Sequence, residues 1–312
     1  MRTLTATKTK MAYSAFGLAI ESELPLPELA PIDTIGERFD LEIIIDRDLK
    51  DTVLLEPYDF VVEDRNVTVN MPEAALFRIE DGNRITISPA EGADEDLIRL
   101  YVLGTCIGAV LLQRGIYPLH GSAIAINGKA YAFVGHSGAG KSTLASALMN
   151  QGYPLLSDDV IAVSPFSAEQ APLVIPAYPQ QKLWQQSLDA FGVNNEELRA
   201  IYGRENKYCI PVEANFCNSA MPLGAVFELV KSESDTAEAL IHPIQKLERL
   251  DILFQHTYRQ FLVQKMDLTR WHFTLSASLA SQLPVYRLVR PADGFTAPQL
   301  VELILNTISA EE

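Results

Sequence analysis

The densest group of chemically active residues is the segment Gly135-His136-Ser137-Gly138-Ala139-Gly140-Lys141-Ser142, which matches the pattern G-x-x-x-x-G-K-[ST]. Its glycines allow the backbone to curl so that successive N–H groups point inward, at the positive end of a following helix. Such a curl binds phosphate oxygens. Lys141 is then placed to reach the β- and γ-phosphates of a nucleotide, and the Ser142 hydroxyl to ligate Mg²⁺. The alternative is a glycine-rich strand-to-helix turn with an exposed lysine. We expect the nucleotide contacts to come from Gly135, Ser137, Gly138, Ala139, Gly140, Lys141, Ser142 and Thr143.

A pair of carboxylates, Asp158 and Asp159, interrupts an apolar stretch farther along the chain. Carboxylates are costly to bury unless they meet a cation. Mg²⁺ on a triphosphate supplies such a cation, and the second carboxylate of the pair can then accept a proton from an attacking hydroxyl. The alternative is a polar strand end that caps a turn.

The elements around these residues follow the order that a phosphate loop requires. The hairpin signal Asn127-Gly128 separates two expected strands, and the second of them, Lys129 to Val134, leads directly into Gly135. We expect a helix from Lys141 to Asn150 and an apolar strand from Pro154 to Val163, with a last helix from Ala297 to about Ile308. His120, just before the hairpin, is by itself more often structural than catalytic.

The first part of the chain is expected to be β-rich and the rest to hold the phosphate site. Turn signals separate five alternating or β-branched runs: Leu41 to Ile45, Phe60 to Glu63, Val67 to Met71, Leu76 to Ile79 and Arg84 to Ser88. A helix is expected from about Glu95 to Arg114. We therefore expect two domains, 1–90 and 91–312. An open sheet edge in the first could recognise a peptide substrate by strand addition.

Composition narrows the class of protein further. The 312 residues carry a formal net charge of -15 with 48% hydrophobic residues, which excludes a mainly disordered chain. Nucleic-acid and anionic-membrane binding need a surplus of Lys and Arg, so we expect neither. Three cysteines without metal-ligand spacing, and an N-terminus without the apolar core of a signal peptide, favour a cytoplasmic protein.

Three segments in this order, LHGSAIAINGKAYAFVG, HSGAGKST and GYPLLSDDVIAV, resemble the HPr serine kinase/phosphorylase family and its shorter kinase relatives. The resemblance covers about residues 117 to 163. It implies an α/β fold with a P-loop kinase core of the HPr kinase/phosphoenolpyruvate carboxykinase type, here joined to a β-rich N-terminal domain. It further implies ATP and Mg²⁺, with Lys141 and Asp158 catalytic, Asp158 the general base, His120 tuning it, and Asp159 holding Mg²⁺ with Ser142.

The differences from the family narrow the expected substrate. His136 stands where the family often has an acidic residue, Thr143 stands where it often has Glu, and the Glu-x-Arg-Gly signature of the bifunctional enzymes is absent. Together with the segment YPQQKLW, this looks more like the HPr-kinase-related proteins associated with peptide modification, including lasso-peptide precursor kinases. In those relatives the acceptor is a serine on a precursor peptide.

The leading hypothesis is therefore an ATP- and Mg²⁺-dependent serine kinase that acts on a peptide or small protein. The sequence is also compatible with a homo-oligomer. Three alternatives stay open: an HPr-type protein serine kinase, a nucleotide-responsive binding module without transfer activity, and a small-molecule kinase or carboxykinase-like enzyme. For three basic residues the sequence allows two interpretations, one functional and one structural. Lys182 either supplies charge to the site or is a surface lysine at a helix start, and Arg204 and Lys207 either close over the site or are solvated.

Overall fold

The computed structural model describes residues 10–33, 38–165, 170–233, 238–245 and 247–311 of a mixed α/β protein with several sheets. The chain forms two compact units, Met1–Pro118 with Arg259–His272, and Leu119–Tyr258 with Phe273–Glu312. Each is described by itself. Residues 1–9, part of the segment considered above as a signal peptide, lie outside the described residues. No helix in the described ranges is both long and apolar enough to cross a membrane.

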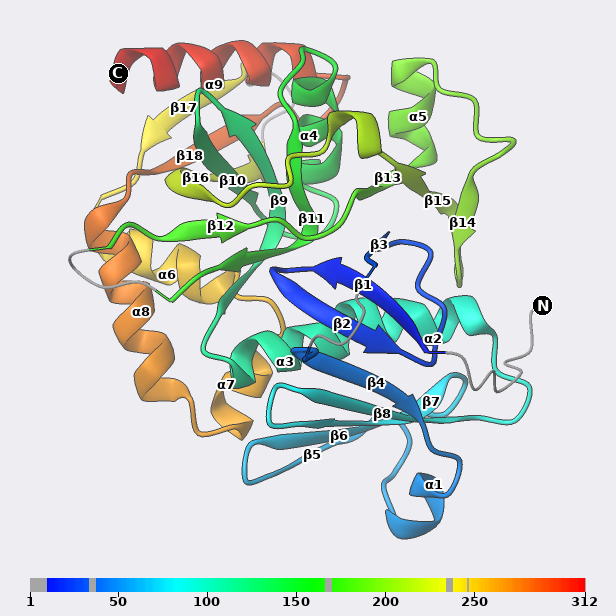
Figure 1. Ribbon diagram of the computed structural model, residues 1–312. Coiled ribbons are helices and arrows are strands. Elements are labelled where there is room, and N and C mark those ends of the chain that lie inside the picture. The colour runs from blue at the N-terminus through cyan, green and yellow to red at the C-terminus, as the bar shows by residue number, and fades with distance from the viewer. Residues whose placement is uncertain (1–9, 34–37, 166–169, 234–237, 246, 312) are drawn as a thin grey trace. The chain divides into compact units, whose positions relative to one another are not determined.

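The first unit is built on an eight-stranded mixed sheet in the order β3-β1-β2-β4-β8-β7-β6-β5 (Figure 1). Strands β4 and β5 have the predicted bounds, and β6, β7 and β8 agree with the prediction to within one residue at each end. The strands β1, β2 and β3 were not predicted. The strands are β1 (Met11–Ala15), β2 (Leu18–Ser22), β3 (Ala30–Pro31), β4 (Leu41–Ile45), β5 (Phe60–Glu63), β6 (Asn66–Met71), β7 (Ala75–Glu80) and β8 (Arg84–Pro89).

The predicted helix after this sheet is present as a continuous segment and belongs to the first unit. It consists of α2 (Glu95–Tyr101), a π-helical stretch η1 (Val102–Cys106) and α3 (Ile107–Gln113). Asp94 caps its start by accepting a hydrogen bond from the main-chain N–H of Asp96 at 2.8 Å. The division into units therefore falls after this helix and not near residue 90, because the helix packs on β7 of the sheet that precedes it.

Both edges of the eight-stranded sheet are protected. At one edge, β3 is two residues long and ends on Pro31. At the other edge, the Lys265 ammonium of α7 (Phe261–Lys265) donates to the main-chain oxygen of Phe60 in β5 at 3.3 Å, and the Phe60 and Phe261 rings contact edge to face. Short strands, proline and covering side chains are the usual ways to block strand pairing. These edges do not favour the capture of a peptide by strand addition. A short helix, α1 (Leu49–Thr52), completes this unit.

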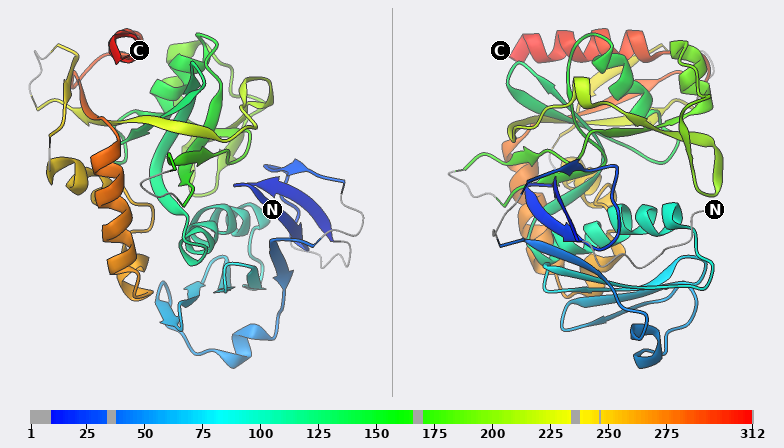
Figure 2. Two further views of the ribbon diagram at one scale, coloured as in Figure 1. Left: turned by 60° about the vertical axis from the view of Figure 1, so that its left-hand side comes forward. Right: turned by 45° about the vertical axis from the view of Figure 1, so that its right-hand side comes forward.

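The second unit contains a seven-stranded sheet in the order β10-β9-β11-β12-β16-β18-β17. Its strands are β9 (Tyr117–Ile126), β10 (Lys129–Val134), β11 (Leu155–Val163), β12 (Leu173–Ile175), β16 (Met221–Lys231), β17 (Leu240–Pro243) and β18 (Val285–Arg290). The first strand of this order, β10, also pairs with β16. Strand β16 therefore has β10 and β18 as parallel neighbours. Figure 2 shows α4 (Lys141–Met149) and α9 (Ala297–Glu311) lying together against this sheet, and their apolar residues share one core with β10 and β16.

A smaller three-stranded sheet in the same unit has the order β13-β15-β14. Its strands are β13 (Gln180–Trp184), β14 (Arg199–Ile201) and β15 (Arg204–Pro211), and α5 (Gln185–Phe191) follows β13. The remaining elements are the 3-10 turn η2 (Glu213–Asn215) and helices α6 (Leu247–Gln255) and α8 (Thr269–Gln282), the last of which spans the division between the units.

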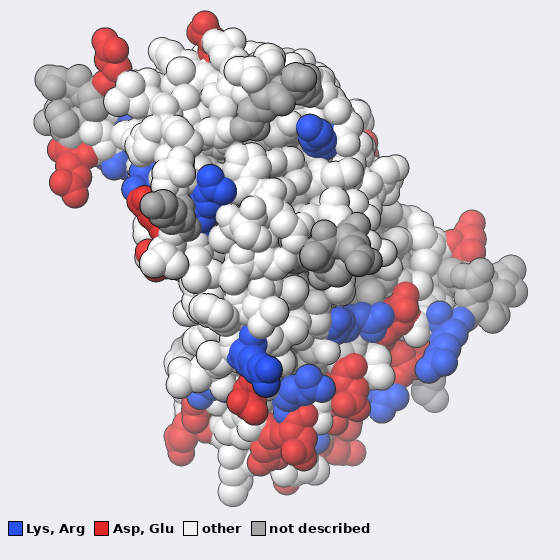
Figure 3. Space-filling view, turned by 90° about the vertical axis from the view of Figure 1, so that its left-hand side faces the viewer, with Lys and Arg blue, Asp and Glu red and all other residues white. Residues whose placement is uncertain are grey.

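On the face drawn in Figure 3, acidic and basic side chains are interspersed.

The predicted elements around the glycine-rich segment are confirmed. Asn127 and Gly128 both have positive φ and join β9 to β10, and residues 135–140 connect β10 to α4. Strand β11 begins one residue later than predicted, and α9 extends three residues beyond the predicted end.

We predict that Gly121→Ala destabilises the protein by roughly 1–3 kcal/mol, the usual range for overpacking. Gly121 in β9 pairs with Val134, and a Cβ atom there would lie 2.2 Å from the main-chain oxygen of Phe133. Urea unfolding measures the change. Gly128→Asn is the control, because that position has open space and Asn tolerates its left-handed backbone. Equal stability of wild type and Gly121→Ala would contradict the packing described here.

Candidate active site

The glycine-rich loop is shaped by glycines that no other residue replaces without strain. Gly135, Gly138 and Gly140 have φ values of 147°, 83° and 107°. A Cβ atom on Gly135 would lie 2.5 Å from the main-chain oxygen of Leu229 in β16. The loop therefore leaves β10 in close contact with the neighbouring parallel strand, at the carboxyl end of both. This end of a parallel sheet is where ligands of α/β proteins usually bind.

The side chain of Lys141 lies back along the loop. Its ammonium donates to the main-chain oxygens of Gly135 at 2.8 Å and His136 at 3.2 Å. Burial lowers the pKa of Lys141, and the carboxylates of Asp158 and Asp159 oppose this shift without cancelling it. The lysine is thus a buried cation within the loop and in the field of both aspartates.

Arg290, at the end of β18, holds the other side of the loop. Its Nε donates to the main-chain oxygen of Ala139 at 2.7 Å, and its Nη2 to that of Gly138 at 3.4 Å. Burial lowers the pKa of this guanidinium. Sequence reasoning missed Arg290, because it lies far along the chain from the loop and no local pattern marks it.

Asp158 is the carboxylate that contacts the loop. It accepts hydrogen bonds from the hydroxyls of Ser142 at 3.0 Å and Ser122 at 2.6 Å, and from the main-chain N–H of Lys182 at 2.9 Å. Ser142 and Asp159 were expected to hold Mg²⁺ together, whereas in the structure the Ser142 hydroxyl is hydrogen-bonded to Asp158. The physical reason lies in the backbone at Asp159, which departs from a regular strand.

Asp159 has a φ of 78°, a left-handed conformation inside β11. Neighbouring residues of a regular strand point to opposite faces of the sheet. Here the left-handed residue breaks that alternation, so that both carboxylates contact Lys182. The Asp159 carboxylate accepts from the Lys182 ammonium at 2.8 Å. Burial by itself would raise the pKa of Asp159, but the Lys182 ammonium and then His120 outweigh it and hold that pKa well below its usual range.

His120 is fixed against Asp159. Its Nδ1 lies 2.9 Å from the main-chain oxygen and 3.5 Å from a carboxylate oxygen of Asp159. Both are acceptors, so Nδ1 carries the hydrogen and Nε2 is left with its lone pair in the neutral ring. Burial lowers the pKa of His120 despite the nearby carboxylate, which favours that neutral form at pH 7. The predicted residues His120, Lys141, Ser142, Asp158 and Asp159 thus come together.

Strand β13 supplies residues whose role the sequence left open or did not show. Lys182 is buried in a strand and not exposed at a helix start, and its partner Asp159 raises its pKa against the effect of burial. Its neighbour Gln181 donates to the main-chain oxygen of Ser142 at 2.8 Å and accepts from the Ser146 hydroxyl at 2.6 Å, which ties β13 to α4. The Thr143 hydroxyl, predicted to contact nucleotide, lies 2.7 Å from that of Ser187.

The buried side chain of Glu228 holds His256, and His256 in turn contacts His136 and His120 near the loop. Glu228 in β16 accepts from Nε of Arg287 at 2.8 Å and lies 3.2 Å from Nε2 of His256. Burial would raise the pKa of Glu228, but these two partners lower it overall. The His256 ring contacts that of His136 in the loop with centroids 5.4 Å apart, and the His256 main-chain oxygen accepts from the N–H of His120 at 2.7 Å.

The oxygens of Ser142 and Asp158 form a donor set suited to Mg²⁺. Mg²⁺ prefers oxygen ligands and is usually held by one or two carboxylates together with substrate phosphates, not by an all-protein cage. One hydroxyl and one carboxylate beside the loop fit that pattern. Within the described residues, no group of three or more His, Cys, Asp or Glu side chains is arranged to hold a metal without such phosphates.

No family model and no curated protein sequence matches the chain. Among solved structures, it is similar to the HPr(Ser) kinase/phosphatase from Coxiella burnetii, with a TM-score of 0.35 and 17% identity over 62% of this chain and 99% of that one. A TM-score and a sequence identity this low say nothing about the reaction, so the function is inferred from the residues of the site.

We predict that Lys182→Met destabilises the protein by about 1–3 kcal/mol at pH 7, less than the ~3–5 kcal/mol of a fully buried pair that loses one partner. The reduction reflects the exposed fractions of the two side chains, 11% for Lys182 and 26% for Asp159. The effect depends on pH with a definite sign. Because the folded-state pKa of Asp159 is lowered, the pair contributes its full stabilisation above the unfolded pKa of about 3.9 and loses it progressively as the pH falls from there toward the much lower folded-state pKa.

Urea unfolding at pH 7 and at about pH 2.5, well below the unfolded pKa, tests this prediction. The stability difference between wild type and Lys182→Met should shrink at the lower pH. Lys129→Met, an exposed position at the far end of β10, is the matched control and should leave both values nearly unchanged. A difference that is the same at both pH values would show that Lys182 acts through packing and not through its charge.

Proposed function

We propose that this protein is an ATP- and Mg²⁺-dependent kinase that transfers the γ-phosphoryl group to a serine hydroxyl of a peptide or small protein. One observation carries the proposal: Ser142, directly after the loop lysine, is hydrogen-bonded to Asp158 at 3.0 Å, and the adjacent Asp159 is held separately by Lys182 and His120. Both carboxylates accept a hydrogen bond from Lys182, one from its main chain and one from its ammonium, but their other side-chain partners differ, so they can have different roles.

Asp158 and Ser142 are the residues that would hold Mg²⁺. A bound Mg²⁺ supplies charge neutralisation on the phosphate oxygens. The loop N–H groups and Lys141 then bind the phosphates of ATP. Phosphoryl transfer depends mainly on positioning and charge neutralisation, and less on strong base catalysis. This assignment reverses the roles that the resemblance implied for the two aspartates.

Asp159 is the residue that would orient the acceptor and take its proton. In the step, the serine oxygen forms a bond to the γ-phosphorus, the bond from that phosphorus to the β-phosphate oxygen breaks, and the hydroxyl proton passes to the Asp159 carboxylate. ADP leaves with the electron pair of the broken bond. The lowered pKa of Asp159 keeps it ionised at neutral pH, so its carboxylate can accept a hydrogen bond from the acceptor hydroxyl and orient it. His120 is a positioning residue that fixes the Asp159 main chain and carboxylate.

A binding module without transfer activity explains less of the site. A nucleotide sensor needs the loop, Lys141 and a metal ligand, but it does not need a second carboxylate held by two further side chains. The left-handed backbone at Asp159 is a conformation that costs a non-glycine residue of order 1–3 kcal/mol, and such strain is concentrated at functional sites.

The direct test is transfer from labelled ATP to candidate acceptors, with products identified by mass spectrometry. The acceptors are serine-containing peptides, including lasso-peptide precursors, and small proteins such as HPr. Free serine and small hydroxyl compounds form a separate arm. Phosphorylation of the small compounds alone would move the assignment to a small-molecule kinase, and ATP binding without transfer to any acceptor would support the binding module.

We predict that three substitutions separate the roles. Lys141→Ala should weaken ATP binding by roughly 10–100-fold, the loss of one or two charge-assisted hydrogen bonds. Asp158→Asn should remove the Mg²⁺ dependence of ATP binding. Asp159→Asn should retain Mg²⁺-dependent binding and lose roughly 10²–10⁴-fold in transfer rate, the usual contribution of a positioned base.

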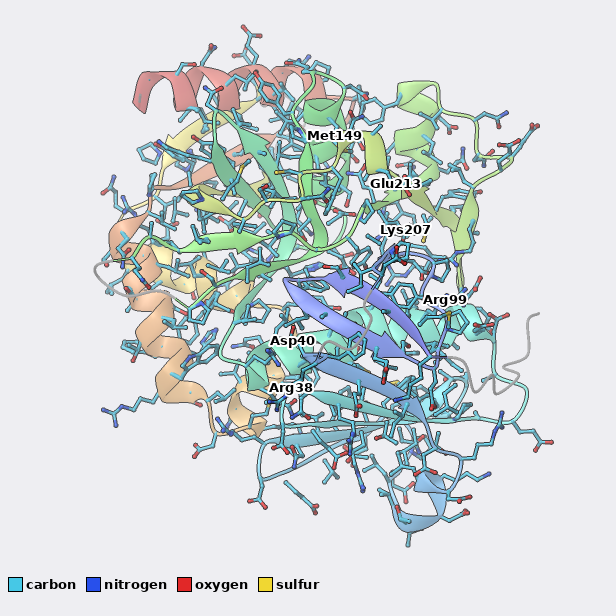
Figure 4. All side chains as sticks on the ribbon, in the orientation of Figure 1. Arg38, Asp40, Arg99, Met149, Lys207 and Glu213 are labelled. Atoms are coloured by element: carbon cyan, nitrogen blue, oxygen red, sulfur yellow. The ribbon has the colours of Figure 1, made fainter. Side chains whose placement is uncertain are left out.

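Calorimetric titration with ATP, with and without Mg²⁺, measures the binding effects, and the acceptor assay measures the rates. Glu213→Gln, an exposed carboxylate in η2, is the control for loss of one negative charge (Figure 4). The opposite pattern, with Asp159→Asn losing the Mg²⁺ dependence and Asp158→Asn losing only the rate, would restore the roles that the sequence resemblance implied.

A further inference from the structure

Lys207 is a third lysine of the site whose charge has no partner in the chemistry described so far. It lies on β15, directly opposite Trp184 of β13, and its Nζ is 5.5 Å from the centroid of the Trp184 ring. Figure 4 labels Lys207 at the three-stranded sheet. By strand alternation, Lys207 shares one face of this sheet with Lys182, the lysine that pairs with Asp159.

Lys207 lies in the electric field of the other charged groups of the site. Burial lowers its pKa, whereas the carboxylates of Asp159 and Asp158 act in the opposite direction. Its own charge also lowers the pKa of Lys141. Lys207 is therefore close enough to the loop lysine to repel it, and close enough to both carboxylates to be attracted by them.

The three lysines differ in what their ammonium groups contact. Lys141 donates to main-chain oxygens of the loop, and Lys182 donates to Asp159. In the part of the chain that the structure describes, Lys207 has the Trp184 ring as its contact and no carboxylate or carbonyl oxygen within hydrogen-bond distance. A partly buried ammonium without an acceptor is costly, and an arriving anion removes that cost.

We propose that Lys207 binds the γ-phosphoryl group of ATP and neutralises its charge during transfer. The inference rests on the proposed function and adds a residue to it. The transferring group has to lie between Lys141, which reaches the β- and γ-phosphates, and Asp159, which faces the acceptor hydroxyl. Lys207 interacts with the groups on both sides of that position. As the bond to the β-phosphate oxygen breaks, negative charge is spread over the three outer oxygens of the phosphoryl group, and a cation there stabilises it.

Trp184 holds the Lys207 ammonium in this position. Trp184 is 42% exposed, although tryptophan residues are on average highly buried. A cation over an indole face is attracted to it, so the ring can direct the lysine toward the phosphates and limit its motion into solvent. Neither residue is marked by the glycine-rich pattern or by the aspartate pair.

The experiment compares the affinities of ATP and ADP for the full chain, measured by calorimetry in the presence of Mg²⁺. ADP lacks the γ-phosphoryl group, so a residue that contacts only this group affects ATP and not ADP. We expect wild type to bind ATP more tightly than ADP. Lys207→Gln should lose about tenfold in ATP affinity, equivalent to ~1.4 kcal/mol, with ADP affinity unchanged within about twofold. Lys207→Arg keeps the charge and should retain most of the preference.

Two controls separate this effect from a change in folding or overall charge. Lys129→Gln removes the same charge at the far end of β10, about 20 Å from the loop at 3.3 Å per residue, and should not alter the ratio of affinities. Trp184→Leu leaves Lys207 in place without its aromatic contact and should lose a smaller part of the preference. Thermal melting of each variant shows whether it is folded.

The outcomes distinguish this inference from the proposed function. If wild type binds both nucleotides and Lys207→Gln keeps the full preference for ATP, Lys207 does not contact the γ-phosphoryl group and the inference is overturned, whereas the kinase assignment stands. If Lys207→Gln loses ATP and ADP affinity equally, the lysine contacts the inner phosphates and the inference is also wrong. If wild type binds neither nucleotide, the proposed function fails and the inference fails with it.

Discussion

The left-handed backbone at Asp159 is the constraint on which the arrangement of the site depends. In a regular strand, Asp158 and Asp159 would point to opposite faces, and one of them would leave the site. With φ at 78°, Asp158 contacts Ser142 and Ser122, and Asp159 contacts Lys182. The hydrogen bonds from His120 and from the two donors of Lys182 offset the cost of that conformation. The strained backbone at Asp159 and the presence of both carboxylates in one site are therefore one feature of the structure.

The second determinant is the parallel arrangement of β10, β16 and β18, whose carboxyl ends meet at the loop. Leu229 in β16 leaves room only for glycine at position 135, and Arg290 at the end of β18 binds two main-chain oxygens of the loop. Glu228 holds His256, whose ring packs on His136 and whose main-chain oxygen accepts from His120. The loop conformation is thus set by strands that are distant in sequence, and the local glycines only make that conformation accessible.

Local patterns predicted much of the fold and the outline of the site. Strands β4 and β5, the Asn127-Gly128 hairpin and the order of strand, loop and helix around Lys141 all follow from short stretches whose turn residues and periodicity are unambiguous. The contacts that define the chemistry did not follow, because they are not local. Lys182 contacts Asp159 only because β13 lies beside β11 in the folded chain. Which partners each of the two aspartates contacts depends on the left-handed backbone at Asp159, and no local sequence pattern predicts that conformation for an Asp residue.

The distribution of charge bears on what the site can accept. Lys141, Lys182 and Lys207 outnumber Asp158 and Asp159, and all five side chains belong to one compact unit. A cluster of charges of this kind repels a further cation unless that cation arrives with phosphates, and it attracts an anion whose several charges can be shared among separate lysines. The chain as a whole has a net charge of -15, so this local surplus runs against the overall balance. This local surplus of positive charge fits the polyanionic nucleotide of the proposed function, because an isolated surface lysine would be solvated and these three are held among carboxylates, main-chain oxygens and an aromatic ring.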